Sequence, residues 1–94
     1  LVFGHRATSV PSSSLKSMIG HPQGASGAAG VVASLLAMRD SYLPPTINQD
    51  IPDPECDLDV IPNVGRERRI DTVLGNCIGF GSKNAAVVLR RHVA

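Results

Sequence analysis

A lysine and a histidine stand five residues apart near the start of the chain, in the stretch LKSMIGHPQGASGAAG. Lys16 and His21 can both handle protons and charge, and the six residues from Ala25 to Gly30 are no larger than alanine or serine. A neutral histidine aimed at a carbonyl oxygen can stabilise the negative charge that develops when an enolate forms. Taken alone, His21 is better explained as a structural residue capping a turn, and Lys16 as a solvated lysine after a strand.

The nearby Lys16 favours a role of His21 in chemistry, and the position of His21 relative to the next helix predicts its charge state. His21 comes just before a predicted helix, and Pro22 lies close to the first-turn position that proline favours. Because the positive end of a helix dipole disfavours an imidazolium, we expect His21 to be neutral and able to donate one hydrogen bond.

A second group of residues with chemical potential is the run Gly79-Phe80-Gly81. Its backbone N–H groups are unencumbered by bulky neighbours and could form an oxyanion hole, although a glycine-rich hairpin turn around a buried phenylalanine has the same pattern. Cys77 precedes this run. A thiolate nucleophile needs a basic or helix N-terminal setting, which the sequence does not show, so we interpret Cys77 as a buried, inert thiol.

The element that follows His21 is predicted to be a buried helix. From about Gly24 to Arg39 no proline interrupts, and apolar residues occur on nearly every side, with Ser34 as the main exception. Gly27 and Gly30 each cost on the order of 1 kcal/mol relative to alanine in a helix. We therefore expect a neighbouring backbone to approach closely at these two positions. Before the helix, the segment 12–16 is interpreted as a short strand or its exit.

Five of the seven prolines lie between Pro44 and Pro62, which excludes a helix and predicts a long, extended, ordered connection. This stretch is also acidic, but its prolines and the missing central glycine do not fit a calcium-binding loop. We interpret its carboxylates as those of a solvated loop. They are Asp50, Asp53, Glu55, Asp57 and Asp59.

The last third of the chain predicts a β-hairpin. Residues 72–78 and 85–89 are rich in Val, Leu and Ile, and the six residues from Gly79 to Asn84 form a turn between them. The first of these strands has no charge and no long alternation, as expected for a strand covered on both faces. The predicted order is therefore strand, buried helix, long Pro-rich loop and β-hairpin.

Length and composition limit what these elements can do alone. Ninety-four residues are enough for one small domain, with 3% aromatic residues and no tryptophan to build its core. A helix that is apolar all round and a strand covered on both faces need more partner surface than this chain contains. We therefore expect a segment of a larger protein, or an obligate oligomer.

Charge and targeting features exclude several classes of protein. The net charge is +1 and no concentrated basic face is visible, so nucleic-acid binding is not expected. The longest small and apolar run is far shorter than a membrane span, and no signal peptide is visible. Cys56 and Cys77 match no metal spacing and fit a reducing compartment.

Three stretches together resemble one family. SSSLKSMIGH, LPPTINQDIPDPECDLDVIPN and GNCIGFGSKN, in this order and spacing, are similar to the C-terminal region of an elongating β-ketoacyl-acyl-carrier-protein synthase. The resemblance covers nearly the whole chain, and the Pro-rich stretch is its most specific part. It implies that residues 1–94 are the C-terminal segment of a thiolase-like layered α/β/α fold, incomplete without upstream chain, in which the buried helix lies between sheets.

The resemblance also implies a reaction and roles for several residues. Members of this family perform a decarboxylating Claisen condensation between an acyl group held on a cysteine and malonyl carrier protein, in fatty acid or polyketide biosynthesis. His21 matches the second of two histidines that stabilise the enolate oxygen, and Lys16 matches the supporting lysine. Phe80, between Gly79 and Gly81, matches the phenylalanine that gates the acyl chain and contributes to the oxyanion hole.

Further features of the family follow from the same match. Asn84 matches the asparagine that closes the gating loop. The resemblance implies three partners: an acyl carrier protein, the rest of the ketosynthase chain, and a second subunit in a homodimer or heterodimer. The phosphopantetheine of the acyl carrier protein carries the substrates. No cofactor of the chain's own, no metal and no nucleic acid are implied, and the implied location is cytoplasmic.

Departures from the family pattern keep alternatives open. Gly30 stands where many bacterial members carry a glutamate paired with the lysine, and Ser82-Lys83 replaces the usual Gly-Thr. The nucleophilic cysteine and the first histidine belong to upstream regions, so we expect this segment to be inactive by itself. One alternative is a non-catalytic chain-length partner subunit. A second alternative is a thiolase, because the stretch GHPQGASG also resembles the histidine motif of that family. In a thiolase, Cys77 would be catalytic.

Overall fold

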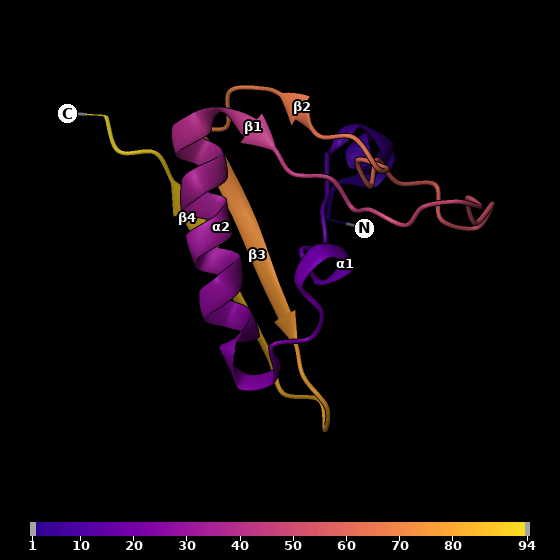
Figure 1. The fold of residues 1–94 in the computed structure, drawn as a ribbon. Helices are drawn as coiled ribbons and strands as arrows, with labels where there is room; N and C mark the ends of the chain where they lie inside the picture. The colour runs from indigo at the N-terminus through magenta and orange to yellow at the C-terminus, as the bar shows by residue number, and fades with distance from the viewer. Residues whose placement is uncertain (1, 94) are drawn as a thin grey trace. The chain divides into compact units, whose positions relative to one another are not determined.

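The structure is a computed structural model that describes residues 2–93. The chain divides into two compact units, residues 1–20 with 43–66 and residues 21–42 with 67–94. The elements are the 3₁₀ helix η1 (Gly4–Ser9), α1 (Lys16–Ile19), the 3₁₀ helix η2 (Gln23–Ala25), α2 (Ser26–Asp40), β1 (Tyr42–Leu43), β2 (Arg66–Glu67), β3 (Thr72–Ile78) and β4 (Asn84–Arg90) (Figure 1). The mixture of helices and sheet is the predicted α/β class.

In the first unit the Pro-rich segment is an extended loop, as predicted, with Ile61 as its core residue. Ile61 is 1% exposed. The loop doubles back on itself, because Thr46 pairs with Pro62 in an isolated parallel bridge. The N–H of Thr46 donates to the carbonyl of Ile61 at 2.9 Å, and the N–H of Asn63 donates to the carbonyl of Thr46 at 3.0 Å.

The segment 12–16 is not a strand, so that prediction is wrong. Its backbone makes single hydrogen bonds to the Pro-rich loop in place of a ladder: the N–H of Ser12 donates to the Asp59 carbonyl at 2.8 Å, and that of Ser14 donates to Thr46 Oγ1 at 3.0 Å. Lys16 begins the one-turn helix α1, which ends at Gly20, where φ is 74°. That conformation is one glycine adopts without a Cβ clash.

In the second unit α2 packs beside β3 of the β3-β4 hairpin (Figure 1). The hairpin is antiparallel, with Thr72 opposite Arg90 and Ile78 opposite Asn84. Its strands match the predicted bounds to within one residue. The helix begins at Ser26, after the short η2, and ends with Ser41 in the left-handed conformation. Ser34, the polar exception in the apolar run, donates its hydroxyl to the carbonyl of Gly30 at 2.7 Å.

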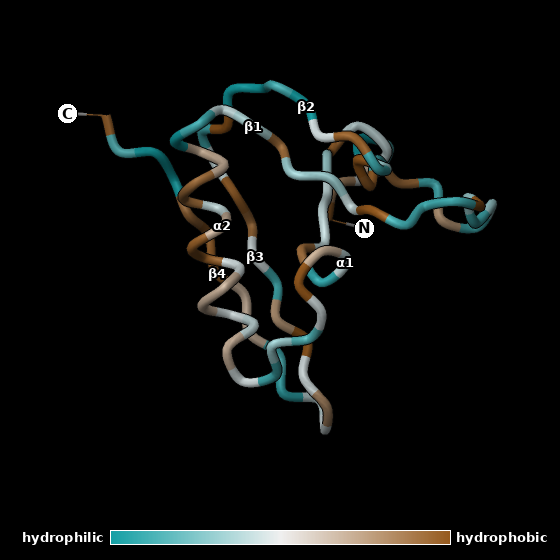
Figure 2. The backbone as a smooth tube through the Cα atoms, viewed as in Figure 1, coloured by the Kyte–Doolittle hydropathy of each residue, from teal (hydrophilic) through white to brown (hydrophobic). Residues whose placement is uncertain are grey.

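The predicted burial of this helix is wrong for the chain by itself. Among the residues of α2 only Met38 is buried, and Val32, Leu35 and Leu36 are exposed. Figure 2 shows hydrophobic residues following one another around the helix, so no single packing face can cover them. The physical reason is the one that the sequence indicates: these residues do not contain enough partner surface.

The hairpin is likewise covered on one face only, contrary to expectation. Exposure alternates along β3, with Val73, Gly75 and Cys77 partly buried and the residues between them exposed. The helix α2 packs against this strand, while Leu74 and Ile78 remain exposed on the other side. A single helix can cover only one face of a two-stranded sheet.

Close packing explains one of the two helical glycines. A Cβ built at Gly27 would lie 3.4 Å from the Cys77 sulfur, whereas one built at Gly30 would meet nothing within 4 Å. The expectation of a neighbouring backbone is therefore wrong at Gly27, where the close neighbour is the Cys77 side chain. It is also wrong at Gly30 within the described residues.

Candidate active site

Lys16 lies in the first unit, at the start of α1. Its side chain is exposed and has no hydrogen bond or ion pair among residues 2–93. The helix turn that carries it is tied to the Pro-rich loop. Ser17 Oγ donates to the Ser14 carbonyl at 2.9 Å and accepts the N–H of Ile47 at 3.0 Å, while Asn48 Nδ2 donates to the Ser17 carbonyl at 3.4 Å.

His21 lies in the second unit, on the segment leading into η2. Its Nδ1 accepts the backbone N–H of Gln23 at 2.9 Å. A ring nitrogen that accepts a hydrogen bond carries no proton, so the neutral ring has its proton on Nε2. The Nε2–H remains available as a donor to another group, which is the form that stabilisation of an enolate oxygen requires.

The origin of this arrangement differs from the one we expect from the sequence. His21 is not at the first turn of α2, because Pro22 and the 3₁₀ turn η2 lie between them. A local turn orients the ring: Gln23 has φ of 49°, in the left-handed region, and its N–H points back at the imidazole. A polar residue two positions after a histidine is a weak sequence signal for such a turn.

The Gly79-Phe80-Gly81 run forms the tip of the hairpin. The N–H of Gly79 donates to the Lys83 carbonyl at 2.8 Å, so the expectation of free N–H groups is wrong for Gly79. The N–H groups of Phe80 and Gly81 have no hydrogen-bond partner in the described part of the chain. Phe80 is 96% exposed, so it is not the buried core of a turn. Asn84 is the first residue of β4 rather than part of the loop.

Cys77 faces the helix, with its sulfur next to Gly27. It is a free thiol that is partly buried. Ile78, the next residue on β3, is 81% exposed. Neighbouring residues of a strand point to opposite faces, so Cys77 and Ile78 cannot serve the same face of the hairpin.

The polar contact that sequence reasoning misses in the first unit is a bidentate ion pair. Arg66 Nη1 donates to Asp59 Oδ2 at 2.8 Å, and Nη2 donates to Oδ1. The side-chain hydrogen bond to Asp59 raises the pKa of the Arg66 guanidinium above its ordinary value. The pair closes the acidic Pro-rich loop. Its only sequence signal is an arginine shortly after an acidic run.

Two broad classes of site are absent from the described residues. Within residues 2–93, no group of three or more His, Cys, Asp or Glu side chains is placed to hold a metal ion. Over the same residues, no helix has the length and apolar character needed to cross a membrane. Of the residues singled out from the sequence, Lys16 belongs to the first unit, and His21, Phe80, Asn84 and the two loop glycines belong to the second.

These motifs agree with a known family. The model of the beta-ketoacyl synthase C-terminal domain matches residues 1–50 of the chain. The chain belongs to the β-ketoacyl synthase family. A thiolase assignment, and with it a catalytic Cys77, is not supported by this match.

Curated relatives of this segment include polyketide ketoacyl synthases and 3-oxoacyl-[acyl-carrier-protein] synthases. The segment is 54% identical over 88 residues to the tetracenomycin polyketide synthase ketoacyl synthase alpha subunit of Streptomyces glaucescens, covering 94% of this chain and 21% of that protein. It is 53% identical over 89 residues to the 3-oxoacyl-[acyl-carrier-protein] synthase 2 of Coxiella burnetii, covering 95% and 22%. The chain spans about one fifth of the length of these relatives.

Solved ketosynthase structures have the same fold over these residues. One is a type II polyketide synthase acyl-carrier protein in complex with its ketosynthase bound to the hexaketide, with a TM-score of 0.93 and 42% identity over 98% of this chain and 22% of that chain. Another is the ishigamide ketosynthase/chain length factor, with a TM-score of 0.83 and 40% identity over 86% and 20%. The predicted thiolase-like fold class is therefore confirmed.

Proposed function

We propose that this chain is the C-terminal part of a 3-oxoacyl-[acyl-carrier-protein] synthase that performs a decarboxylating Claisen condensation. The observation that carries the proposal is the hydrogen bond from the Gln23 N–H to His21 Nδ1, which leaves Nε2–H as a donor. It accompanies a family match over residues 1–50. The whole enzyme's activity also requires regions outside these residues, including the nucleophilic cysteine and the first of the two histidines.

In the proposed reaction, the bond between the malonyl α-carbon and its carboxylate breaks and CO₂ leaves. The bonding electrons form an enolate, whose oxygen accepts a hydrogen bond from His21 Nε2–H. The enolate carbon attacks the acyl thioester on the cysteine. The resulting oxyanion is stabilised by the Phe80 N–H and collapses to the 3-oxoacyl product as the cysteine thiolate departs.

Lys16 and the hairpin tip have supporting roles in this proposal. Lys16 supplies positive charge near the reacting carboxylate, and the Phe80 ring controls entry of the acyl chain. The free N–H groups of Phe80 and Gly81 support the oxyanion role, whereas Gly79 shapes the loop through its bond to Lys83. Asn84 closes the loop by beginning β4 opposite Ile78.

The proposal includes an acyl carrier protein as substrate carrier, so the chain needs no cofactor of its own. A solved relative is described as a complex of a ketosynthase with its acyl-carrier protein, which supports this assignment. We also propose a dimeric assembly in the cytoplasm. The exposed apolar residues of α2 and of the hairpin support a larger body around this segment.

Half-reactions of the full-length protein test the role of His21. We expect His21→Ala to lower malonyl decarboxylation by roughly 10²–10³-fold, the effect of removing one oxyanion donor, while acyl transfer to the cysteine stays near wild type. Phe80→Ala serves as the contrast, because it should change acyl-chain selectivity more than decarboxylation. Equal loss of both half-reactions in His21→Ala would contradict the enolate role.

A second candidate is a non-catalytic chain-length partner, since one solved relative is a ketosynthase/chain length factor. The presence of Lys16, His21 and Phe80 favours the enzyme. Mass spectrometry of the full-length protein after incubation with an acyl thioester separates the two. A covalent acyl group on a cysteine identifies the enzyme, and an unmodified protein identifies the partner subunit.

A further inference from the structure

We propose that Thr46-Ile47-Asn48, here called the clamp segment, positions α1 and thereby Lys16 for the decarboxylation step. The inference rests on the proposed function, because it assigns Lys16 its role in that reaction. It makes Thr46 and Ser17 positioning residues that act through Lys16 without touching the substrate.

The helix turn that carries Lys16 cannot order itself. A single turn fixes several backbone dihedrals for few hydrogen bonds, so isolated short helices are unstable in water. Within α1 the Met18 and Ile19 N–H groups both donate to the Leu15 carbonyl, at 2.9 and 3.0 Å. The order of this turn must therefore come from contacts outside it.

Each residue of the clamp segment supplies one such contact. Thr46 Oγ1 accepts the Ser14 N–H at 3.0 Å. The Ile47 N–H donates to Ser17 Oγ at 3.0 Å, and Asn48 Nδ2 donates to the Ser17 carbonyl at 3.4 Å. Three consecutive residues thus bind the backbone and side chain on both sides of Lys16.

The clamp segment is itself anchored in the most buried part of its unit. The Thr46 N–H and carbonyl are both paired, with Ile61 and with Asn63. Ile61 is 1% exposed and has φ of 51°. A β-branched residue rarely adopts this left-handed conformation, and such strain persists where surrounding contacts over-determine it. The anchor is therefore rigid, and the clamp segment transmits its position to α1.

Removing one hydroxyl tests this positioning in the full-length protein. Thr46→Val keeps the shape of the side chain but loses the acceptor for the Ser14 N–H. We expect malonyl decarboxylation to fall roughly 10-fold, in line with the cost of small misplacements in active sites, while acyl transfer changes less than about 2-fold. Thr46→Ser keeps the hydroxyl and should restore decarboxylation. Ser13→Ala is the matched control, because the Ser13 hydroxyl has no partner among residues 2–93.

A double variant shows whether Thr46 acts through Lys16. If it does, Lys16→Met with Thr46→Val decarboxylates no more slowly than Lys16→Met alone, because the two changes remove one effect. If the double variant lost activity by the product of the two single-variant fold-losses, the proposal would be overturned. Parallel loss of both half-reactions, or a Thr46→Ser variant as slow as Thr46→Val, would also overturn it.

Amide hydrogen exchange provides a readout that does not depend on catalysis. Thr46→Val and Ser17→Ala should each accelerate exchange in the peptide covering residues 14–20, and Thr46→Ser should not. Unchanged exchange would overturn the clamp itself. If exchange accelerates but Lys16→Met decarboxylates at the wild-type rate, the role proposed for Lys16 is wrong, and with it the inference that the clamp serves the reaction. Loss of decarboxylation in His21→Ala would still support the proposed function.

Discussion

Gly27, in the first turn of α2, faces Cys77 of β3 so closely that a Cβ built on the glycine would lie 3.4 Å from the sulfur. This distance is ordinary van der Waals contact, so one methyl group fits and a larger side chain does not. The run of small residues after His21 therefore has a definite packing role at Gly27. It lets the helix approach the strand where Cys77 projects toward it.

The first prediction concerns this contact. Gly27→Leu in the full-length protein should lower the free energy of unfolding by roughly 1–3 kcal/mol through overpacking, whereas Gly27→Ala, whose methyl group fits, should raise it by up to about 1 kcal/mol. Denaturant titration measures both. Because Cys77→Ala removes the sulfur, the double variant with Gly27→Leu should recover part of the loss. Equal stability of Gly27→Leu and the wild type would contradict the packing seen here.

The second prediction concerns the tautomer of His21. Since Nδ1 accepts the Gln23 N–H, the proposed donor to substrate is Nε2–H. His21→Gln places an amide near the Nε2 position and should retain part of the decarboxylation activity. His21→Asn places its amide near Nδ1 and should be as inactive as His21→Ala, roughly 10²–10³-fold below wild type. The measurement is the rate of malonyl decarboxylation by the three variants. If His21→Asn were more active than His21→Gln, the donor would be Nδ1 and the prediction would be wrong.

The third prediction concerns the hairpin tip. A Cβ at Gly79 would lie 2.9 Å from the backbone carbonyl oxygen of Lys83, so Gly79→Ala must displace the loop. We expect a loss of stability of roughly 1–3 kcal/mol and altered acyl-chain selectivity, because Phe80 moves with the loop. Gly81 has open space but φ of 73°. Gly81→Asn, which tolerates this conformation, should be the milder change when both variants are compared by thermal unfolding.

Local pattern is enough to predict some of these elements. The hairpin is predictable because residues 72–78 and 85–89 are apolar strands on either side of a glycine-rich turn. The helix is predictable from a proline-free apolar run. In both cases neighbouring residues determine the structure, and the observed bounds differ by only one or two positions.

Features that depend on distant residues are not predictable in the same way. The turn at Lys16 is tied by hydrogen bonds to Thr46, Ile47 and Asn48, about thirty positions away. Nothing in the pattern of residues 12–16 distinguishes such a turn from a strand. The orientation of the His21 ring is missed for a different, local reason, because it follows from the positive φ of Gln23 rather than from the helix dipole.

Burial is a second property that the sequence pattern does not predict correctly for these residues by themselves. An all-round apolar helix indicates burial, yet Val32 and Leu35 are 57% and 52% exposed here. The pattern is typical of a helix surrounded by more partner surface than these residues contain. Relatives roughly five times as long as this chain have room for the missing surface.

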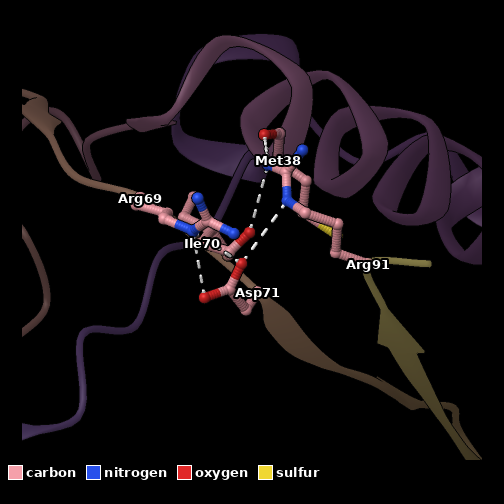
Figure 3. A network of polar contacts seen from close by, with 5 residues as sticks. All are labelled: Met38, Arg69, Ile70, Asp71 and Arg91. Atoms are coloured by element: carbon pink, nitrogen blue, oxygen red, sulfur yellow. Dashed lines mark hydrogen bonds and ion pairs between the residues drawn. The ribbon is translucent and has the colours of Figure 1, made fainter. Parts of the chain in front are cut away.

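The last prediction concerns Arg91, which joins the end of α2 to the hairpin (Figure 3). Its Nη2 donates to the Met38 carbonyl and, at 3.3 Å, to the Ile70 carbonyl, while Nε lies 3.5 Å from Asp71 Oδ1. A cation at this position also complements the negative end of the helix dipole.

Replacing this guanidinium should therefore separate the helix end from the strand. Hydrogen bonds from a charged donor contribute roughly 1.5–3 kcal/mol each, and we expect Arg91→Met to lower the free energy of unfolding by about that amount. Arg91→Lys should restore only part of the loss, because one ammonium can replace Nη2 at the two carbonyls but cannot at the same time replace Nε beside Asp71. Arg90→Met is the matched control, since Arg90 is exposed and its side chain has no partner among the described residues. Equal effects of Arg90→Met and Arg91→Met in denaturant titration would show that the network in Figure 3 contributes nothing beyond surface charge.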